Sequence, residues 1–280
     1  MSKRPSVAEL SKSISACDEA TLAELAEDPR AGVRRLVSRE EKRREKLLAE
    51  AARLRRMLRH EEELWANGQQ VAGVDEVGVG PLAGPVMAAA VILPPGTSIE
   101  GINDSKQLDR SAREELAEKI QERAVAFAVG SCDREEIDRL NIYQAAREAM
   151  RRAVSQLSPV PDALLVDART VPGLAIAQRP IIKGDSQSQS IAAASIVAKV
   201  ARDQWMRKAA TRFPDYGFES HKGYYCPQHL EALSRLGPCE LHRRSFSPVA
   251  ALCSEAELQA LSGVREQTHA ARAPEQTELF

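Results

Sequence analysis

The stretch VAGVDEVGVGPLAGPVMAAAVIL, residues 71–93, contains two short apolar runs separated by a turn rich in glycine and proline. Apolar runs of this length, bounded by Gly and Pro, are typical of buried β-strands. We therefore expect one strand at 71–77 and a second at 86–93. Two acids, Asp75 and Glu76, interrupt the first run. A carboxylate in an apolar setting is unfavourable unless a cation or a hydrogen bond offsets it, so these two acids are the first candidates for chemistry.

The rest of the chain predicts an α/β domain with helical and polar flanks. Three further apolar runs are consistent with buried strands, at 124–131, 163–168 and 175–184. Three segments have the apolar spacing of helices, at 109–123, 140–157 and 186–212. Strands and helices that alternate along a chain favour a sheet covered by helices. We expect this α/β domain at 71–253, after a helical basic extension at 1–70 and before a polar C-terminal tail at 254–280.

Composition and charge exclude several classes of protein. The 280 residues are 43% hydrophobic and 28% charged, which suits a folded core and excludes a disordered chain. The formal net charge of -1 excludes a uniformly basic protein, and 4% aromatic residues disfavour a binder built mainly on base stacking. The five cysteines include no CxxC pair, so neither a zinc ribbon nor a disulfide framework is indicated. Without an apolar run that resembles a signal peptide or a membrane span, we expect a cytoplasmic protein that is not bound to a membrane.

The N-terminal extension is locally basic. Between Arg30 and Arg59, twelve Lys and Arg residues stand against four acids, and apolar residues recur at roughly helical spacing. One interpretation is an amphipathic helix whose charged face is simply solvated. The other is a basic arm that follows phosphates, because twelve cations on one helix repel one another without an anionic partner. The sequence leaves both open.

Two more acids lie at the ends of apolar segments. Asp167 ends the run ALLVD, and Asp185 lies in KGDS, where a strand passes into a helix. One such acid alone is more often a cap or half of a core ion pair, and Asp185 could be the N-cap of the following helix. Together with Asp75 and Glu76, however, they occupy strand ends, where α/β folds place their sites. Oxygen-only ligands favour Mg²⁺ or Mn²⁺ over zinc, so the pattern predicts a site for a hard metal ion.

The glycines after the acid pair do not form a known nucleotide-binding loop. The spacing of Gly78, Gly80 and Gly84 is one residue too long for G-x-G-x-x-G, and Pro85 stands where a Walker loop needs Lys. What remains is a glycine-rich turn whose backbone N–H groups can approach a ligand closely. Because neighbouring strand residues point to opposite faces, we expect a bulge or a sharp strand end here that brings the two acids together.

Six segments between 71 and 250 form a longer pattern: GVDEVGVGPLAGPVMAAAVIL (73–93), NDSKQL (103–108), LLVDA (164–168), IIKGDSQSQSIAAASIVAKVARD (181–203), YGFESHKGY (216–224) and HRRSFSP (242–248). In this order and spacing they resemble bacterial ribonuclease HII, and the agreement of several long motifs makes the match specific. The resemblance implies a ribonuclease-H-like fold, with a central mixed sheet flanked by helices and an N-terminal helical appendage. It also implies endonucleolytic cleavage of RNA in RNA–DNA hybrids and at single ribonucleotides in duplex DNA. Cleavage would fall 5′ to the ribonucleotide and leave a 3′-hydroxyl and a 5′-phosphate.

By position, the resemblance assigns catalysis and the binding of two Mn²⁺ or Mg²⁺ ions to Asp75, Glu76, Asp167 and Asp185. It assigns substrate binding to Gly78, Val79, Gly80, Ser105, Lys106, Lys183 and Tyr224. In the family the glycine backbone senses the ribose 2′-hydroxyl and the tyrosine packs against a sugar. Tyr224 could instead be ordinary packing, and either lysine a solvated surface charge.

One departure from the family pattern concerns the glycine-rich turn. The family usually has Gly-Arg-Gly where this chain has Gly78-Val79-Gly80. The arginine side chain, a phosphate contact, is therefore missing. We expect weaker substrate binding with a lower salt dependence, and intact metal chemistry.

Two other classes of function remain as alternatives. One is a hybrid-binding module without catalysis, which the presence of all four acids disfavours. The other is a different two-metal nuclease of the same broad fold, such as a resolvase or an exonuclease, which the motifs around the acids disfavour. The expected partner is an RNA–DNA hybrid or a ribonucleotide-containing duplex, bound by a monomer. The C-terminal EQTELF (275–280) faintly resembles a peptide that binds a sliding clamp, although six such residues arise easily by chance.

Overall fold

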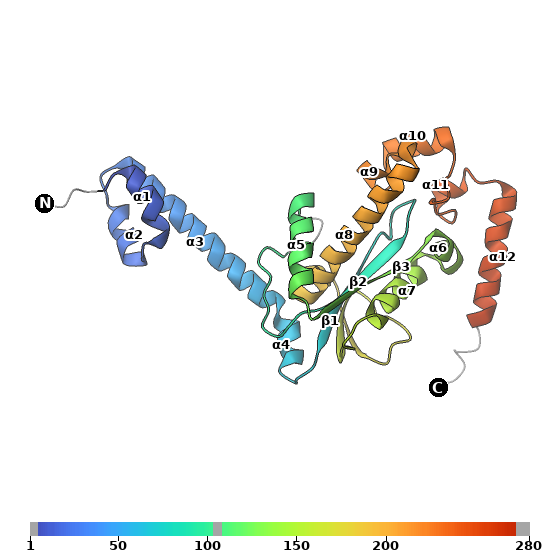
Figure 1. Cartoon of the computed structure of the whole chain (residues 1–280), viewed down its shortest axis with the longest axis horizontal. Coiled ribbons are helices and arrows are strands. Elements are labelled where there is room, and N and C mark those ends of the chain that lie inside the picture. The colour runs from blue at the N-terminus through green and yellow to red at the C-terminus, as the bar shows by residue number, and fades with distance from the viewer. Residues whose placement is uncertain (1–4, 103–107, 273–280) are drawn as a thin grey trace. The chain divides into compact units, whose positions relative to one another are not determined.

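The structure, a computed structural model, describes residues 5–102 and 108–272 (Figure 1). The chain divides into two compact units, Met1–Arg56 and Met57–Phe280. Among the described residues, no helix is both long enough and apolar enough to cross a membrane.

The first unit is helical. It consists of α1 (Val7–Ser13), a 3-10 turn (Ile14–Ala16), α2 (Glu19–Ala26) and the long helix α3 (Ala31–Met57). Side chains of Ser6 and Asp18 cap α1 and α2, which satisfies backbone N–H groups of their first turns. A small apolar cluster joins the helices: Leu10, Ile14, Leu22, Val33 and Val37. Glu40 pairs with Arg43 and Arg44, so part of the basic charge of α3 is balanced within the helix.

The second unit is built on a five-stranded sheet in the order β3-β2-β1-β4-β5. The strands are β1 (Val71–Val77), β2 (Val86–Ile92), β3 (Ala126–Cys132), β4 (Ala163–Asp167) and β5 (Ala177–Ile181). The pairs β1–β2 and β2–β3 are antiparallel, whereas β1–β4 and β4–β5 are parallel. The prediction of a mixed sheet is confirmed. The strand expected at 124–131 begins only at Ala126, because Ala124 still closes the helix before it.

Two helices cover opposite faces of this sheet (Figure 1). α7 (Ile142–Ser155) packs across β1, β2 and β3, and α8 (Gln189–Arg212) packs across β1 and β2. Strand alternation assigns the faces, since Ala72 and Val74 pack in the cluster with α7 whereas Gly73 faces α8. A Cβ at position 73 would lie 2.0 Å from the carbonyl carbon of Ser190. Glycine at this position therefore lets α8 lie directly on the strand that carries the acid pair.

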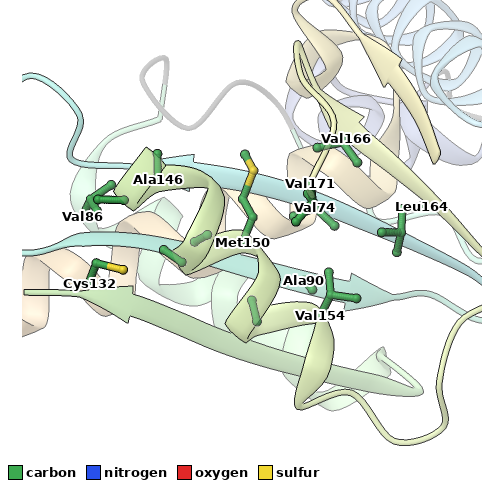
Figure 2. Close-up of a cluster of buried hydrophobic side chains, with 14 of the residues drawn as sticks. Val74, Val86, Ala90, Cys132, Ala146, Met150, Val154, Leu164, Val166 and Val171 are labelled. Atoms are coloured by element: carbon green, nitrogen blue, oxygen red, sulfur yellow. The ribbon is translucent and has the colours of Figure 1, made fainter. Parts of the chain in front are cut away.

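Figure 2 shows the apolar cluster between α7 and the sheet. Met150 and Val154 of α7 pack among residues of three strands, including Val74, Ala90 and Leu164. All of these side chains are buried, and burial of each large apolar side chain contributes about 1.5–3 kcal/mol. This cluster holds α7 against the face of β1 that is opposite to the face covered by α8.

Further elements complete the second unit. They are α4 (Arg59–Trp65), α5 (Arg110–Arg123), α6 (Arg134–Leu140), α9 (Phe218–His221), α10 (Pro227–Leu236), α11 (Ser247–Ala250), α12 (Glu255–Arg272) and 3-10 turns at Gly184–Ser186 and Pro214–Tyr216. The helix expected at 140–157 is shorter, because Asn141 (φ 67°) ends α6 and its side chain caps α7. The helix expected from 186 begins at Gln189 and is capped by Ser188. Asp185 is therefore not the N-cap of α8.

α4 lies in the unit that contains the sheet. Its Glu61 is fully buried and accepts hydrogen bonds from Ser188 Oγ at 2.6 Å and from the Ser190 N–H at 2.9 Å. The second of these bonds satisfies an N–H group in the first turn of α8. Glu63 adds an ion pair with Arg179 of β5 at 2.6 Å. Contacts of the sheet unit therefore extend to residues before position 71.

Candidate active site

The parallel pairing of β1 with β4 brings acids of the two strands together. Val74 pairs with Val166, so the next residues, Asp75 and Asp167, lie beside each other. Leu165 packs with a residue of α8, and Asp167 follows it by two positions. Both acids therefore belong to the α8 face of the sheet, at the carboxyl ends of their strands.

Asp185 reaches the same edge from β5. The last residue of β5, Ile181, pairs with Asp167. The chain then passes through Lys183, which has a φ of 54°, into the 3-10 turn that contains Asp185. The N–H of Gly184 donates to Asp167 Oδ1 at 2.7 Å, which ties this turn to the end of β4.

One pocket of about 260 Å³ is lined by all four of these carboxylates. The other residues of its lining come from the end of β1, the glycine-rich loop, α8 and the turn before α10: Val77, Gly78, Val79, Gly80, Ser195, Lys199 and Tyr224. Asp75 is buried in it, whereas Tyr224 is 39% exposed. The structure thus places the four predicted acids, the glycine-rich turn and the predicted tyrosine around one cavity.

The carboxylates of the pocket repel one another. Burial raises the pKa of Asp75 well above its ordinary value, and the negative charges of Glu76 and Asp167 raise this pKa further. A hydrogen bond with Ser195 acts in the opposite direction, as does the Glu76 N–H, which lies 2.7 Å from Asp75 Oδ1. Acidic oxygens concentrated in this way, without His or Cys in the lining, fit a hard divalent cation such as Mg²⁺ or Mn²⁺.

The carboxylates are nevertheless not gathered around one point. Within residues 5–102 and 108–263, no three His, Cys, Asp or Glu side chains form a group that could hold a metal ion. The expected bulge is absent, because the pairing of β1 with β2 is regular from Ala72 to Val77. Asp75 and Glu76 therefore project to opposite faces. To reach a shared ion, their side chains would have to rotate toward the strand end.

Two buried arginines hold the glycine-rich loop. Arg243 donates to three carbonyl oxygens, those of Gly78, Val79 and Gly84. Arg202 donates to three others, those of Ala83, Pro85 and Lys222. Both side chains are fully buried, and burial lowers the pKa of Arg243 to about 9. Buried guanidinium groups that are satisfied by backbone carbonyls fix the course of this loop.

The two glycines of the loop differ in their surroundings. Gly78 has a φ of 87°, and a Cβ there would lie 2.3 Å from Nε of Arg202, so only glycine fits. At Gly80 no atom lies within 4 Å of such a Cβ. Both glycines line the pocket, and the loop is therefore closely packed at Gly78 and open at Gly80.

Tyr224 is held by a network of histidines. His229 Nδ1 donates to the carbonyl oxygen of Tyr224 at 2.9 Å, because a carbonyl can only accept. His242 Nδ1 accepts from the Cys239 N–H, so its Nε2 carries the proton and donates to His229 Nε2 at 3.0 Å. The carbonyl of His221 accepts from the Tyr224 N–H at 2.8 Å. His229 and His242 are fully buried, and burial lowers the pKa of His242 to about 3.

Other predicted site residues lie elsewhere. Lys183 is exposed and is not part of the pocket lining. Ser105 and Lys106 lie outside the described residues, and so does the C-terminal segment 275–280. The side chain of Val79 packs against the apolar cluster of Figure 2, so it brings no charge to the pocket.

Two pocket residues on α8 were not predicted. Ser195 forms a hydrogen bond with Asp75, and Lys199 pairs with Asp203 at 2.7 Å. The ammonium group of Lys199 also lies 5.6 Å from the centre of the Tyr224 ring. A signal was present in the sequence, because these two polar residues are four positions apart in an alanine-rich helix and so share one helix face.

Comparison with known proteins identifies the family to which this architecture belongs. The family model of ribonuclease HII matches residues 72–249, and that of the ribonuclease HII N-terminal domain matches residues 6–65. Ribonuclease HII from Myxococcus xanthus is 55% identical over 230 residues, which cover 81% of this chain and 78% of the relative. Ribonuclease HII from Geobacillus thermodenitrificans is 51% identical over 226 residues, which cover 80% of this chain and 87% of the relative.

Solved structures share the fold. Ribonuclease H2 from Pyrococcus horikoshii OT3 has a TM-score of 0.56 at 25% identity, with 71% of this chain and 99% of that chain covered. Ribonuclease HII from Archaeoglobus fulgidus, solved in complex with PCNA, has a TM-score of 0.54 at 26% identity, with coverages of 63% and 95%. The acid-lined strand ends thus occur in a chain that belongs to the ribonuclease HII family, nucleases of the ribonuclease H type that hydrolyse their substrate.

Proposed function

We propose that this chain is a metal-dependent endoribonuclease that cuts RNA in RNA–DNA hybrids and at single ribonucleotides embedded in duplex DNA. Cleavage falls 5′ to the ribonucleotide and leaves a 3′-hydroxyl and a 5′-phosphate. The observation that carries this proposal is the pocket lined by Asp75, Glu76, Asp167 and Asp185 beside an open glycine-rich loop, in a member of the ribonuclease HII family.

The four carboxylates are the proposed ligands of two Mg²⁺ or Mn²⁺ ions. When bound, such a pair of ions activates a water molecule and stabilises the leaving oxygen of a phosphodiester. The residues of the chain prepare this site. Ser195 and the Glu76 N–H orient the Asp75 carboxylate, and the Gly184 N–H orients that of Asp167. Burial, together with the charges of Glu76 and Asp167, disfavours the ionised state of Asp75, so a cation bound in the pocket would have a strong electrostatic attraction to this carboxylate.

Recognition of the ribose would come from the pocket wall. The 2′-hydroxyl is the group that distinguishes RNA from DNA at a given position. Gly78 and Gly80 line the pocket, and the space beside Gly80 is open to a ligand. We assign the ribose contact to this backbone, and the neighbouring sugar contact to the ring of Tyr224, a residue whose backbone is held by the histidine network.

A cleavage assay tests this function. The substrate is a DNA duplex with one embedded ribonucleotide, incubated with Mg²⁺ or Mn²⁺, and the controls are an all-DNA duplex and a chelator. We expect a single nick 5′ to the ribose that the chelator abolishes. Binding without cleavage in either metal would favour a hybrid-binding module. Cleavage of a four-way DNA junction without any ribose would favour a resolvase.

We further propose that α3 acts as a basic arm on the same substrate. Ion pairs within the helix balance part of its charge, so the number of basic residues does not give the number of phosphate contacts. The salt dependence of activity measures that number. The shortened chain for comparison should start at Met57, because a start at position 71 would remove the bonds from Glu61 to α8. A steeper salt dependence of activity in the full chain would support the arm, and equal slopes would contradict it. Recruitment by a sliding clamp through residues 275–280 remains a second, separate proposal.

A further inference from the structure

A second exposed tyrosine near the pocket is accompanied by two arginines. Tyr143 lies in the first turn of α7 and is 49% exposed. The guanidinium carbon of Arg147 lies 5.3 Å from the centre of its ring, and that of Arg169 lies 5.2 Å away. We call these three residues the Tyr143 platform. Two cations within reach of one ring are held there by cation–π attraction despite their mutual repulsion.

The Tyr143 platform borders the acid-lined pocket. Arg169 follows Asp167 by two positions, and its Nη2 lies 3.5 Å from Glu76 Oε1. Glu76 lines the pocket but, by strand alternation, projects to the α7 face of the sheet. The platform therefore lies on the α7 side of the site, whereas Lys199 and Tyr224 approach it from the α8 side.

The charge of the platform is only partly balanced. Arg169 pairs with Glu76, while the described contacts of Arg147 are the Tyr143 ring and a hydrogen bond from its Nε to the carbonyl oxygen of Thr170 at 3.1 Å. A guanidinium group on an aromatic ring keeps its planar edge of N–H donors, which matches two oxygens of a phosphate. Four carboxylates in one pocket repel a polyanion, so cations at the rim are needed for close approach.

We propose that the Tyr143 platform binds a backbone phosphate of the nucleic-acid duplex beside the acid-lined pocket. This inference rests on the proposed function, because its ligand is the substrate of that reaction. Val79, which is partly buried and packs against the apolar cluster between α7 and the sheet, contributes no charge on this side of the loop. Arg147 and Arg169 supply that charge from α7 and from the segment after β4.

The test measures binding of a fluorescently labelled duplex with one embedded ribonucleotide by anisotropy. The full chain is used in the presence of chelator, so that no cleavage occurs, at several salt concentrations between 50 and 200 mM. The variants are Arg147→Gln, Arg169→Gln and the double variant. Loss of each phosphate contact should lower the slope of log affinity against log salt by about 0.9, which corresponds to a loss of up to about eightfold at 0.1 M salt.

Matched variants separate binding from folding. Arg212→Gln is the control for charge, because Arg212 also lies over an aromatic ring, that of Phe213, and pairs with a glutamate, Glu240. It lies thirteen residues after Lys199 on α8, about 20 Å along the helix. Its slope should equal that of the wild type. Arg147→Lys keeps the charge, so it should keep the slope while losing part of the affinity.

The outcomes distinguish the platform from the proposed function. A wild-type slope and affinity in the double variant, even with a lower melting temperature, would overturn the platform and leave only a structural role. If the wild type fails to nick the duplex in Mg²⁺ and Mn²⁺, the proposed function fails. The slopes measured with chelator then still decide whether the platform binds nucleic-acid phosphate.

Discussion

The glycine-rich loop and the strand ends line the same pocket, but they are held in opposite ways. The loop is fixed by Arg202 and Arg243, whose buried guanidinium groups are satisfied by backbone carbonyls. At the strand ends the ionised form of Asp75 is unfavourable, because burial and the charges of Glu76 and Asp167 raise its pKa. Contacts of the loop thus stabilise the fold, whereas the buried charge of Asp75 is unfavourable to it. We attribute the grouping of the four acids in one pocket to the chemistry of the site.

Replacement of a pocket acid should have the largest effect, a loss of activity without a loss of stability. Asp75→Asn removes a proposed metal ligand, and we expect activity to fall by about a thousandfold or more, since metal catalysis is worth several kcal/mol. The same change removes a buried charge that repels Glu76 and Asp167, so the melting temperature should not fall. Activity and thermal unfolding of the same preparation check both. Substantial activity in Asp75→Asn would contradict the assignment of this residue.

Replacement of a buried arginine should have the opposite profile. Arg243→Met leaves the carbonyls of Gly78, Val79 and Gly84 without their donor, and unfolding should become easier by about 3–5 kcal/mol. Urea denaturation measures this loss. Arg212→Met, in which an exposed arginine is removed, should cost less than about 1 kcal/mol. Equal losses of stability in the two variants would show that the buried position of Arg243 adds nothing to its contribution to stability.

Adding a methyl group at position 73, within the acid-bearing strand, or at position 80, in the loop after it, compares a closely packed site with an open one. Gly73→Ala would place a Cβ 2.0 Å from the Ser190 backbone, so we expect a loss of about 1–3 kcal/mol as α8 is displaced. Gly80→Ala meets open space and should leave stability within about 0.5 kcal/mol. Chemical denaturation of both variants gives the comparison. A stable Gly73→Ala variant would mean that α8 is less closely packed on β1.

The smallest effect concerns the histidines behind Tyr224. His242 has a folded-state pKa of about 3 against an ordinary value of 6.5. As the pH falls below 6.5, the unfolded chain takes up a proton that the folded chain does not, so stability is lost toward pH 3. The loss is up to about 1.4 kcal/mol per pH unit. His242→Gln should therefore lose less stability than the wild type between pH 7 and pH 5 in urea titrations. If the wild type and His242→Gln lost the same stability between pH 7 and pH 5, His242 would be excluded as the source of the loss.

Much of the sheet could be predicted because it depends on local pattern. The run 71–77 is apolar and bounded by Gln and Gly, and β1 has these bounds. Helix α6 was not predicted, although Asp133 and Glu136 have the spacing of a capping box, which the structure contains. The interpretation of Asp185 as an N-cap was wrong, because Ser188, three residues later, accepts a hydrogen bond from the Ile191 N–H in the first turn of α8.

The rest of the site depends on contacts between distant segments. No local rule places Arg202 and Arg243 in the interior, because charged residues are mostly exposed and all but one of their carbonyl partners lie more than a hundred residues away. Likewise, Gly78 alone does not determine whether β1 has a bulge after Asp75. The strand is regular here because it pairs with β2, a separate segment of the chain. The roles of the pocket residues remain predictions that the cleavage and binding assays address.

The order of the strands also has a consequence for folding kinetics. β1, the glycine-rich loop and β2 form one hairpin, so half of the pocket is local in sequence. Asp167 and Asp185 join it only after β4 pairs with β1, a contact between residues about ninety positions apart. Pairing over such a separation is slow because a long loop must close first. During refolding, return of catalysis should therefore lag behind formation of the hairpin, and enzymatic activity would report the formation of the parallel half of the sheet.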